Sequence, residues 1–192
     1  MVNPLKLLQS HFKDMPFSPK DINGLGITQA QVIQLLHNES IHRLSRGVYV
    51  LSGADLSDEA QFRAATMRIN GPSAICLVSA LAFYGITDHI PKKVWLLVPE
   101  DKHSAHKDLR LLRSRNPKWK VGIDSHNGYK ITNIERSIVD ALTTKRVLGF
   151  SIGVGALKSA LQNKKTSLDK IIKMATQLGV DHRVMSYIEA LS

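Results

Sequence analysis

The stretch Ile27–Ser52, ITQAQVIQLLHNESIHRLSRGVYVLS, predicts a short helix that is followed directly by a two-stranded hairpin. Thr28 is a suitable N-cap, and Gln31 stands three residues later, as a capping box requires. Apolar residues then recur at helical spacing, with Ile33 at the margin of their face and polar side chains opposite. Two runs rich in β-branched residues flank residues 45–47, where a glycine can supply the positive φ of a tight hairpin.

Two further helix-start signals precede this stretch. Asn3-Pro4 places a proline at the first helical position, where it is tolerated, and Ser18-Pro19 repeats the pattern. Three helices followed by a hairpin is the order of a winged helix-turn-helix, in which the third helix enters the major groove and the hairpin flanks the phosphate backbone. Residues 1–53 are therefore predicted to form a DNA-binding domain.

Residues 57–192 are predicted to form a mixed α/β domain with a C-terminal helical segment, so the whole chain belongs to the α+β class. Its second helix is apolar almost all round, which predicts burial at the centre of a second core. The expected elements are helices at about 58–70 and 73–85, strands at 94–98, 109–113, 118–123 and 128–131, a helix that opens with a capping box at 132–135 and runs to 142, and helices over about 152–162, 166–179 and from 181 onward.

The composition favours an anionic partner. The formal net charge is +10 and the pI is about 9.8, and nucleic acid is the commonest partner of such a chain, although a basic protein can also be merely soluble. The single cysteine, Cys76, excludes an internal disulfide and a zinc site with several cysteines. There is no leader pattern and no apolar run near 18 residues, so we expect a cytoplasmic protein without a membrane partner.

The positive charge is unevenly distributed along the chain. Residues 1–53 carry a net charge of +2, whereas residues 102–120, called the basic stretch below, carry +6. Such a surface can follow nucleic-acid phosphate or receive an acidic protein, and a solvated face of strands and loops is the alternative. The cations of the basic stretch are Lys102, Lys107, Arg110, Arg113, Arg115, Lys118 and Lys120.

Four segments follow the N-terminal helices: LSRGVYVL (Leu44–Leu51), SALAFYGI (Ser79–Ile86), VWLLVP (Val94–Pro99) and ITNIERSIVDAL (Ile131–Leu142). The R-G-V-Y segment and the pattern I-T-x-x-E-R-S/T-I-x-D-x-L resemble the AbiEi-type antitoxins of abortive-infection type IV toxin–antitoxin systems, over most of residues 5–145. The resemblance implies a winged-helix domain that represses its own promoter. It also implies an α/β domain that counters a nucleotidyltransferase-type toxin without needing a stable complex. A solitary regulator with the same architecture remains an alternative.

The third helix and the hairpin carry the side chains expected to contact double-stranded DNA, with inverted repeats in the protein's own promoter as the expected site. Glutamines can bond adenine through N6 and N7, a threonine at a helix N-terminus can bond phosphate, and hairpin arginines can contact phosphates or the minor groove. A polar helix face that meets only solvent is the alternative. The predicted DNA-contacting residues are Thr28, Gln29, Gln31, Gln34, Arg43 and Arg46.

An enzymatic alternative rests on Asp88 and on Glu100-x-Lys102, which flank an apolar strand as in metal-dependent restriction-type nucleases. Because Glu100 and Lys102 follow Pro99, they lie beyond the strand rather than on it. We therefore expect no enzymatic activity, no catalytic residue, no cofactor and no metal site.

Arg136 and Asp140 stand four residues apart on the helix that ends at residue 142. At this spacing they are expected to form an exposed ion pair, which contributes roughly 0.3–0.5 kcal/mol to stability. Arg136 is also a candidate for a functional surface.

Overall fold

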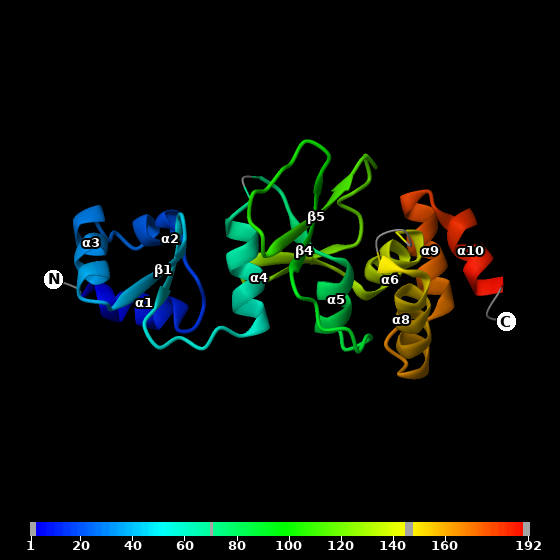
Figure 1. Ribbon diagram of the computed structural model, residues 1–192, viewed down its shortest axis with the longest axis horizontal. Coiled ribbons are helices and arrows are strands. Elements are labelled where there is room, and N and C mark those ends of the chain that lie inside the picture. The colour runs from blue at the N-terminus through cyan, green and yellow to red at the C-terminus, as the bar shows by residue number, and fades with distance from the viewer. Residues whose placement is uncertain (1–2, 70, 145–147, 190–192) are drawn as a thin grey trace. The chain divides into compact units, whose positions relative to one another are not determined.

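The computed structural model describes residues 3–69, 71–144 and 148–189. The chain forms two compact units, Met1–Gly71 and Pro72–Ser192, and the fold is mixed α+β (Figure 1). Among the described residues, no helix combines the length and the apolar character needed to cross a bilayer.

The first unit contains α1 (Pro4–Phe12), α2 (Pro19–Gly24), α3 (Gln29–His37), β1 (Ile41–Ser45), β2 (Val48–Leu51) and α4 (Asp58–Met67). The predicted start signals are confirmed, because Asn3, Ser18 and Thr28 each accept a hydrogen bond from a backbone N–H of the following helix. Ser18 and Thr28 form complete capping boxes with Asp21 and Gln31, so these helix starts are stabilised locally.

A small core joins the first three helices to the hairpin. Strands β1 and β2 pair in antiparallel register with an irregularity between Arg43 and Ser45. Phe17, which precedes α2, exchanges two backbone hydrogen bonds of 2.9 Å with Tyr49, so the hairpin gains a third, one-residue strand. The buried residues of this core are Leu8, Phe17, Ile22, Ile27, Val32, Leu35, Ile41 and Leu51.

Helix α4 belongs to the first unit, whereas the sequence placed it in the domain 57–192. The guanidinium carbon of Arg63 lies 5.6 Å from the centroid of the Phe12 ring, and its Nη2 lies 3.8 Å from the Asp21 carboxylate. These contacts tie α4 to α1 and α2, and the division between the two units follows Gly71 rather than residues 53–57. The predicted end of this helix at Asn70 lies outside the described residues.

The second unit contains one five-stranded sheet and its helices. The strand order is β5-β4-β3-β7-β6, with β3 antiparallel to β4 but parallel to β7, and with β4 parallel to β5. Its elements are β3 (Ala74–Ile75), α5 (Leu77–Phe83), β4 (Val94–Pro99), β5 (Leu109–Ser114), β6 (Ile123–His126), β7 (Tyr129–Thr132), α6 (Ile134–Thr143), α8 (Phe150–Gln162), α9 (Leu168–Leu178) and α10 (Asp181–Glu189).

The main core of this unit joins one face of β4 to five helices. Trp95 and Leu97 alternate along β4 and therefore point to the same face, and they belong to one buried cluster with residues of α5, α6, α8, α9 and α10. Helix α6 contacts α5, α8, α9 and α10, so it is the central helix of this group (Figure 1). The predicted C-terminal helical segment is confirmed by α8, α9 and α10.

Three local predictions for this unit are wrong. The apolar run predicted as a helix from Ser73 begins with the central strand β3, and its helix starts only at Leu77, because a fully buried strand and a buried helix share the same apolar pattern. The predicted strand at 118–123 is a turn that becomes strand only at Ile123. Finally, Asn133 rather than Thr132 caps α6, and Thr132 ends β7.

Candidate nucleic-acid interface

Helix α3 turns a polar face outward because its apolar side chains are used by the core. Val32 and Leu35 are buried beneath the helix. The exposed side chains of α3 are Gln29, Ala30, Ile33, Gln34 and His37. The predicted base-reading residues Gln29 and Gln34 therefore lie on the accessible face, and Ile33 joins them instead of completing the apolar face.

Gln31 is half-buried and occupied by the cap of its own helix. Its Oε1 accepts from the backbone N of Thr28 at 2.8 Å and from the Thr28 hydroxyl at 3.2 Å. Bidentate contact with adenine uses both the oxygen and the nitrogen of a glutamine amide. The structure therefore favours Gln29 and Gln34 over Gln31 for base contact, and the hydroxyl hydrogen of Thr28 is directed at Gln31 rather than outward.

The hairpin presents two exposed arginines. Arg46 stands at its tip beside Gly47, whose φ of 74° is the positive value that the turn requires. Arg43 lies on β1, and its Nε donates to the Ser45 carbonyl at 3.3 Å, which leaves its terminal nitrogens for a phosphate. Both predicted backbone-contacting residues are thus accessible.

Ser52 fastens the base of the hairpin to the end of α3. Its hydroxyl contacts the Glu39 carbonyl and lies 2.9 Å from His42 Nε2, while its backbone N donates to Ser40 O at 3.1 Å. Ser40 N in turn donates to the Leu35 carbonyl of α3 at 2.9 Å. These bonds connect helix and hairpin continuously, so their relative orientation is set before any ligand binds.

Two cations of the basic stretch pair with acids that precede it in the chain, and a third lies over an aromatic ring. Glu100 lies against Arg115, and Asp101 lies 3.3 Å from Lys102, so residues 100–120 carry a net charge of +4. Arg110 lies over the Trp95 ring at 4.7 Å. These contacts engage three of the seven predicted cations, although Arg115 stays largely exposed.

The strand cations of this stretch also point in two directions. Arg110 and Arg113 are both exposed on β5 but stand three residues apart, which places them on opposite faces of a strand. Lys118 and Lys120 lie on the following turn, and Lys120 Nζ lies 5.8 Å from the centroid of the Trp119 ring. Lys107 and Arg115 are exposed, and Lys102 is partly buried. The structure does not gather the seven cations on a single face.

The residues of the nuclease alternative have other partners. Glu100 pairs with Arg115, and Lys102 pairs with Asp101. Asp88 lines a separate cavity of about 210 Å³ together with His89 and residues of α8. In the described ranges, no group of three or more histidine, cysteine, aspartate or glutamate side chains is placed to hold a metal ion.

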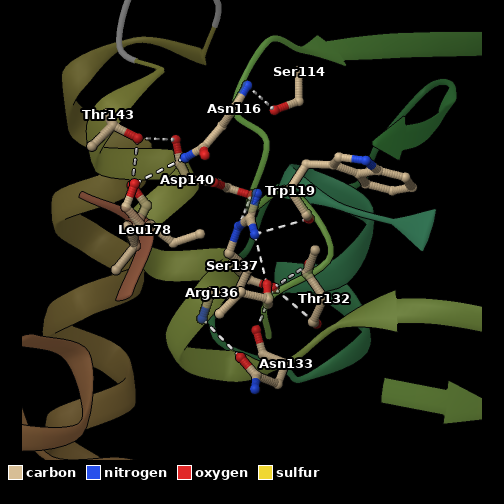
Figure 2. Close-up of polar contacts among 12 residues, drawn as sticks. Ser114, Asn116, Trp119, Thr132, Asn133, Arg136, Ser137, Asp140, Thr143 and Leu178 are labelled. Carbon is tan, nitrogen blue, oxygen red and sulfur yellow. Dashed lines mark hydrogen bonds and ion pairs between the residues drawn. The ribbon is translucent and has the colours of Figure 1, made fainter. Parts of the chain in front are cut away.

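The prediction that Arg136 lies in an exposed ion pair is wrong, because its side chain is buried. It is 3% exposed, and its Nε donates to Asp140 Oδ2 at 2.8 Å. Its Nη1 donates to the carbonyls of Trp119 at 3.1 Å and Val121 at 2.6 Å (Figure 2). Burial raises the pKa of the Asp140 carboxyl, and Arg136 partly opposes this effect.

The Arg136 side chain therefore holds the turn that carries two cations of the basic stretch. Asn116 anchors the start of this turn through a 2.9 Å bond to the Leu178 carbonyl (Figure 2). At the end of the turn, Gly122 O accepts from Asn133 N at 2.9 Å. The four-residue spacing of Arg136 and Asp140 predicted that the two side chains pair. It could not predict that Arg136 also supports the turn, because the turn lies more than ten residues earlier in the sequence. The buried Arg136 side chain thus supports the turn from within rather than forming part of the surface.

No protein-family model matches the chain, and comparison with curated proteins finds no match either.

Proposed function

We propose that the protein is a DNA-binding transcriptional repressor whose first unit acts as a winged helix-turn-helix. The observation that carries this proposal is the connection through Ser52, which holds the exposed face of α3 and the arginine hairpin in one orientation. In this arrangement α3 reads base edges through Gln29 and Gln34, while Arg43 and Arg46 contact the backbone.

The dimensions of the elements support this proposal. Helix α3 has nine residues and is about 14 Å long at a rise of about 1.5 Å per residue, and an α-helix, which is about 10–12 Å in diameter, fits a major groove about 12 Å wide. The Phe17–Tyr49 bridge gives the hairpin a third strand, which resists bending of the wing when its tip meets a phosphate.

The resemblance to AbiEi-type antitoxins suggests a biological role for this repressor. We propose that the repressor binds inverted repeats in its own promoter in the cytoplasm and acts as the antitoxin of a type IV phage-defence system. The second unit then counters a nucleotidyltransferase-type toxin functionally rather than in a stable complex. Its helical core and the Arg136-supported turn are the features available for this role.

Binding of the full chain to its own upstream DNA tests the repressor function. Fluorescence anisotropy between about 50 and 200 mM salt is expected to show a linear fall of log K with log salt, because phosphate contacts release counterions. A shuffled duplex of equal length and composition is the control for specificity. Equal affinity for both duplexes, or affinity independent of salt, contradicts the proposal.

Antitoxin activity requires a separate experiment. The neighbouring genes are sequenced, and a nucleotidyltransferase found among them is expressed alone and together with the full chain while growth is recorded; absence of such a gene contradicts the antitoxin role. Relief of growth arrest by both the wild type and an Arg43→Ala/Arg46→Ala variant is expected, because neutralisation does not need promoter binding. Persistent growth arrest with the wild type contradicts the antitoxin role and leaves DNA binding to be judged by the anisotropy measurement.

A further inference from the structure

Ile33 is an apolar side chain in the middle of the polar face of α3. It is 60% exposed, whereas Val32 and Leu35 on the same helix are buried in the core. Among the nine residues of α3 it is the large aliphatic side chain that the helix turns outward. Packing in the core therefore does not explain why position 33 is an isoleucine.

The neighbours of Ile33 define what it faces. At about 100° of rotation per residue, Gln29 lies on one side of Ile33, and His37, Ala30 and Gln34 lie on the other. All four neighbours are exposed. The outer face of α3 thus has Ile33 and Ala30 near its centre, an amide at each margin, and His37 in its last turn, on the C-terminal side of Ile33.

This pattern matches one edge of the DNA major groove. The thymine C5-methyl is the apolar group that the groove presents, and glutamine amides pair with adenine N6 and N7 in the same groove. An isoleucine between two glutamines is therefore complementary to adjacent A·T pairs, with a methyl group opposite the apolar centre. A G·C pair at that point lacks the methyl group and presents hydrogen-bonding groups that isoleucine cannot bond.

We infer that Ile33, supported by Ala30, contacts a thymine methyl group in the operator. Ile33 is therefore a specificity-determining residue. The inference rests on the proposed DNA-binding function and deepens it by naming the base group recognised. Ile33 does not hydrogen-bond, so its contribution is separable from that of Gln29 and Gln34.

Replacing thymine by deoxyuridine tests the inference, because it removes the methyl group and keeps every hydrogen bond of the base pair. Duplexes that the full chain selects from a random library are resynthesised with a single deoxyuridine at each thymine in turn. At one or two positions wild-type affinity is expected to fall about fourfold, the factor for one buried methyl group. Ile33→Ala is expected to bind the thymine and deoxyuridine duplexes equally, while Gln34→Ala keeps the difference.

Three outcomes overturn the inference. Wild-type protein that binds selected DNA without distinguishing deoxyuridine refutes the role of the methyl group and leaves the proposed function intact. The inference also fails if Ile33→Ala still binds thymine duplexes more tightly than deoxyuridine duplexes by the full wild-type factor. It fails likewise if Ile33→Ala changes the sedimentation mass instead, because Ile33 would then be a contact between two copies of the chain. Failure to select any duplex refutes the proposed function itself. Thermal unfolding of Ile33→Ala, expected to match the wild type because the side chain is exposed, controls for folding.

Discussion

Arg136 donates from Nε to Asp140 Oδ2 at 2.8 Å inside the second unit, while its Nη1 bonds the carbonyls of Trp119 and Val121. One buried guanidinium thus joins two turns of α6 to a loop that precedes it in the chain. The arrangement satisfies the charge and several donors of the arginine, which a buried ion pair needs if it is not to destabilise the fold.

Removing one partner of this pair is expected to be costly. At neutral pH, Arg136→Ala should lower the free energy of unfolding by about 3–5 kcal/mol, because it leaves the Asp140 carboxyl buried without its partner. Arg115→Ala, which breaks the exposed pair with Glu100, is the matched control and should change it by less than about 1 kcal/mol. Urea unfolding measures both. Equal losses in the two variants would show that burial of the Arg136 pair has no energetic consequence.

The raised pKa of Asp140 predicts a pH dependence of stability. The ordinary value is 3.8, and burial raises the pKa in the folded chain. Above 3.8 the unfolded chain releases this proton first, so the contribution of Asp140 to the free energy of unfolding should fall as the pH rises. Unfolding of the wild type and Asp140→Asn at several pH values above 3.8 isolates this contribution as their difference. A difference that grows with pH would contradict the assigned direction.

Two glycines of α8 should respond oppositely to alanine. A Cβ on Gly153 would lie 3.0 Å from the Ala141 carbonyl carbon of α6, so Gly153→Ala should destabilise the protein by about 1–3 kcal/mol through overpacking. A Cβ on Gly155 would meet nothing within 4 Å, so Gly155→Ala should stabilise the protein by up to about 1 kcal/mol through helix propensity. Thermal or urea unfolding compares the two. Stabilisation by both variants would mean that α8 does not approach α6 so closely.

The two glutamines Gln31 and Gln34 are expected to have separate roles. Gln31→Ala removes half of the capping box and should lower stability by about 0.5–2 kcal/mol with little change in base preference. Gln34→Ala should leave stability unchanged and relax discrimination at particular bases by about 1–3 kcal/mol. Unfolding curves and binding to single-base variants of a selected duplex measure both effects. A loss of discrimination in Gln31→Ala would show that its amide oxygen leaves the cap on binding.

Arg46 is expected to contribute affinity without specificity. Arg46→Ala should weaken binding to selected and non-selected duplexes by a similar factor and reduce the slope of log K against log salt by about 1. The exposed Lys158, on α8 in the second unit, supplies a matched control as Lys158→Ala, which should leave the slope unchanged. An unchanged slope in Arg46→Ala would remove the hairpin tip from the phosphate contacts.

Local signals were sufficient wherever the determining contacts lie within one helical turn. Asn3, Ser18 and Thr28 cap their helices as the sequence predicted, because the bonded groups are two or three residues apart. Strands β4 and β5 and the C-terminal helices were also predicted, since their apolar patterns have the length and period of those elements. For the candidate site, the sequence predicted contacts by Gln29, Gln34 and the hairpin arginines, and the fold leaves these side chains exposed.

The tertiary structure decided what depends on partners distant in the sequence. Sheet pairing with β4 and β7 makes Ala74–Ile75 a strand within an apolar run that was expected to be helical. Arg136 holds residues 118–122 as a turn, although their alternating pattern is typical of a strand. Pairing with Glu100 and Asp101 reduces the charge of the basic stretch, and packing of Val32 and Leu35 leaves Ile33 outside the core. Periodicity and charge describe one segment at a time. Only the fold determines which other segment packs against it, pairs with it or neutralises its charge.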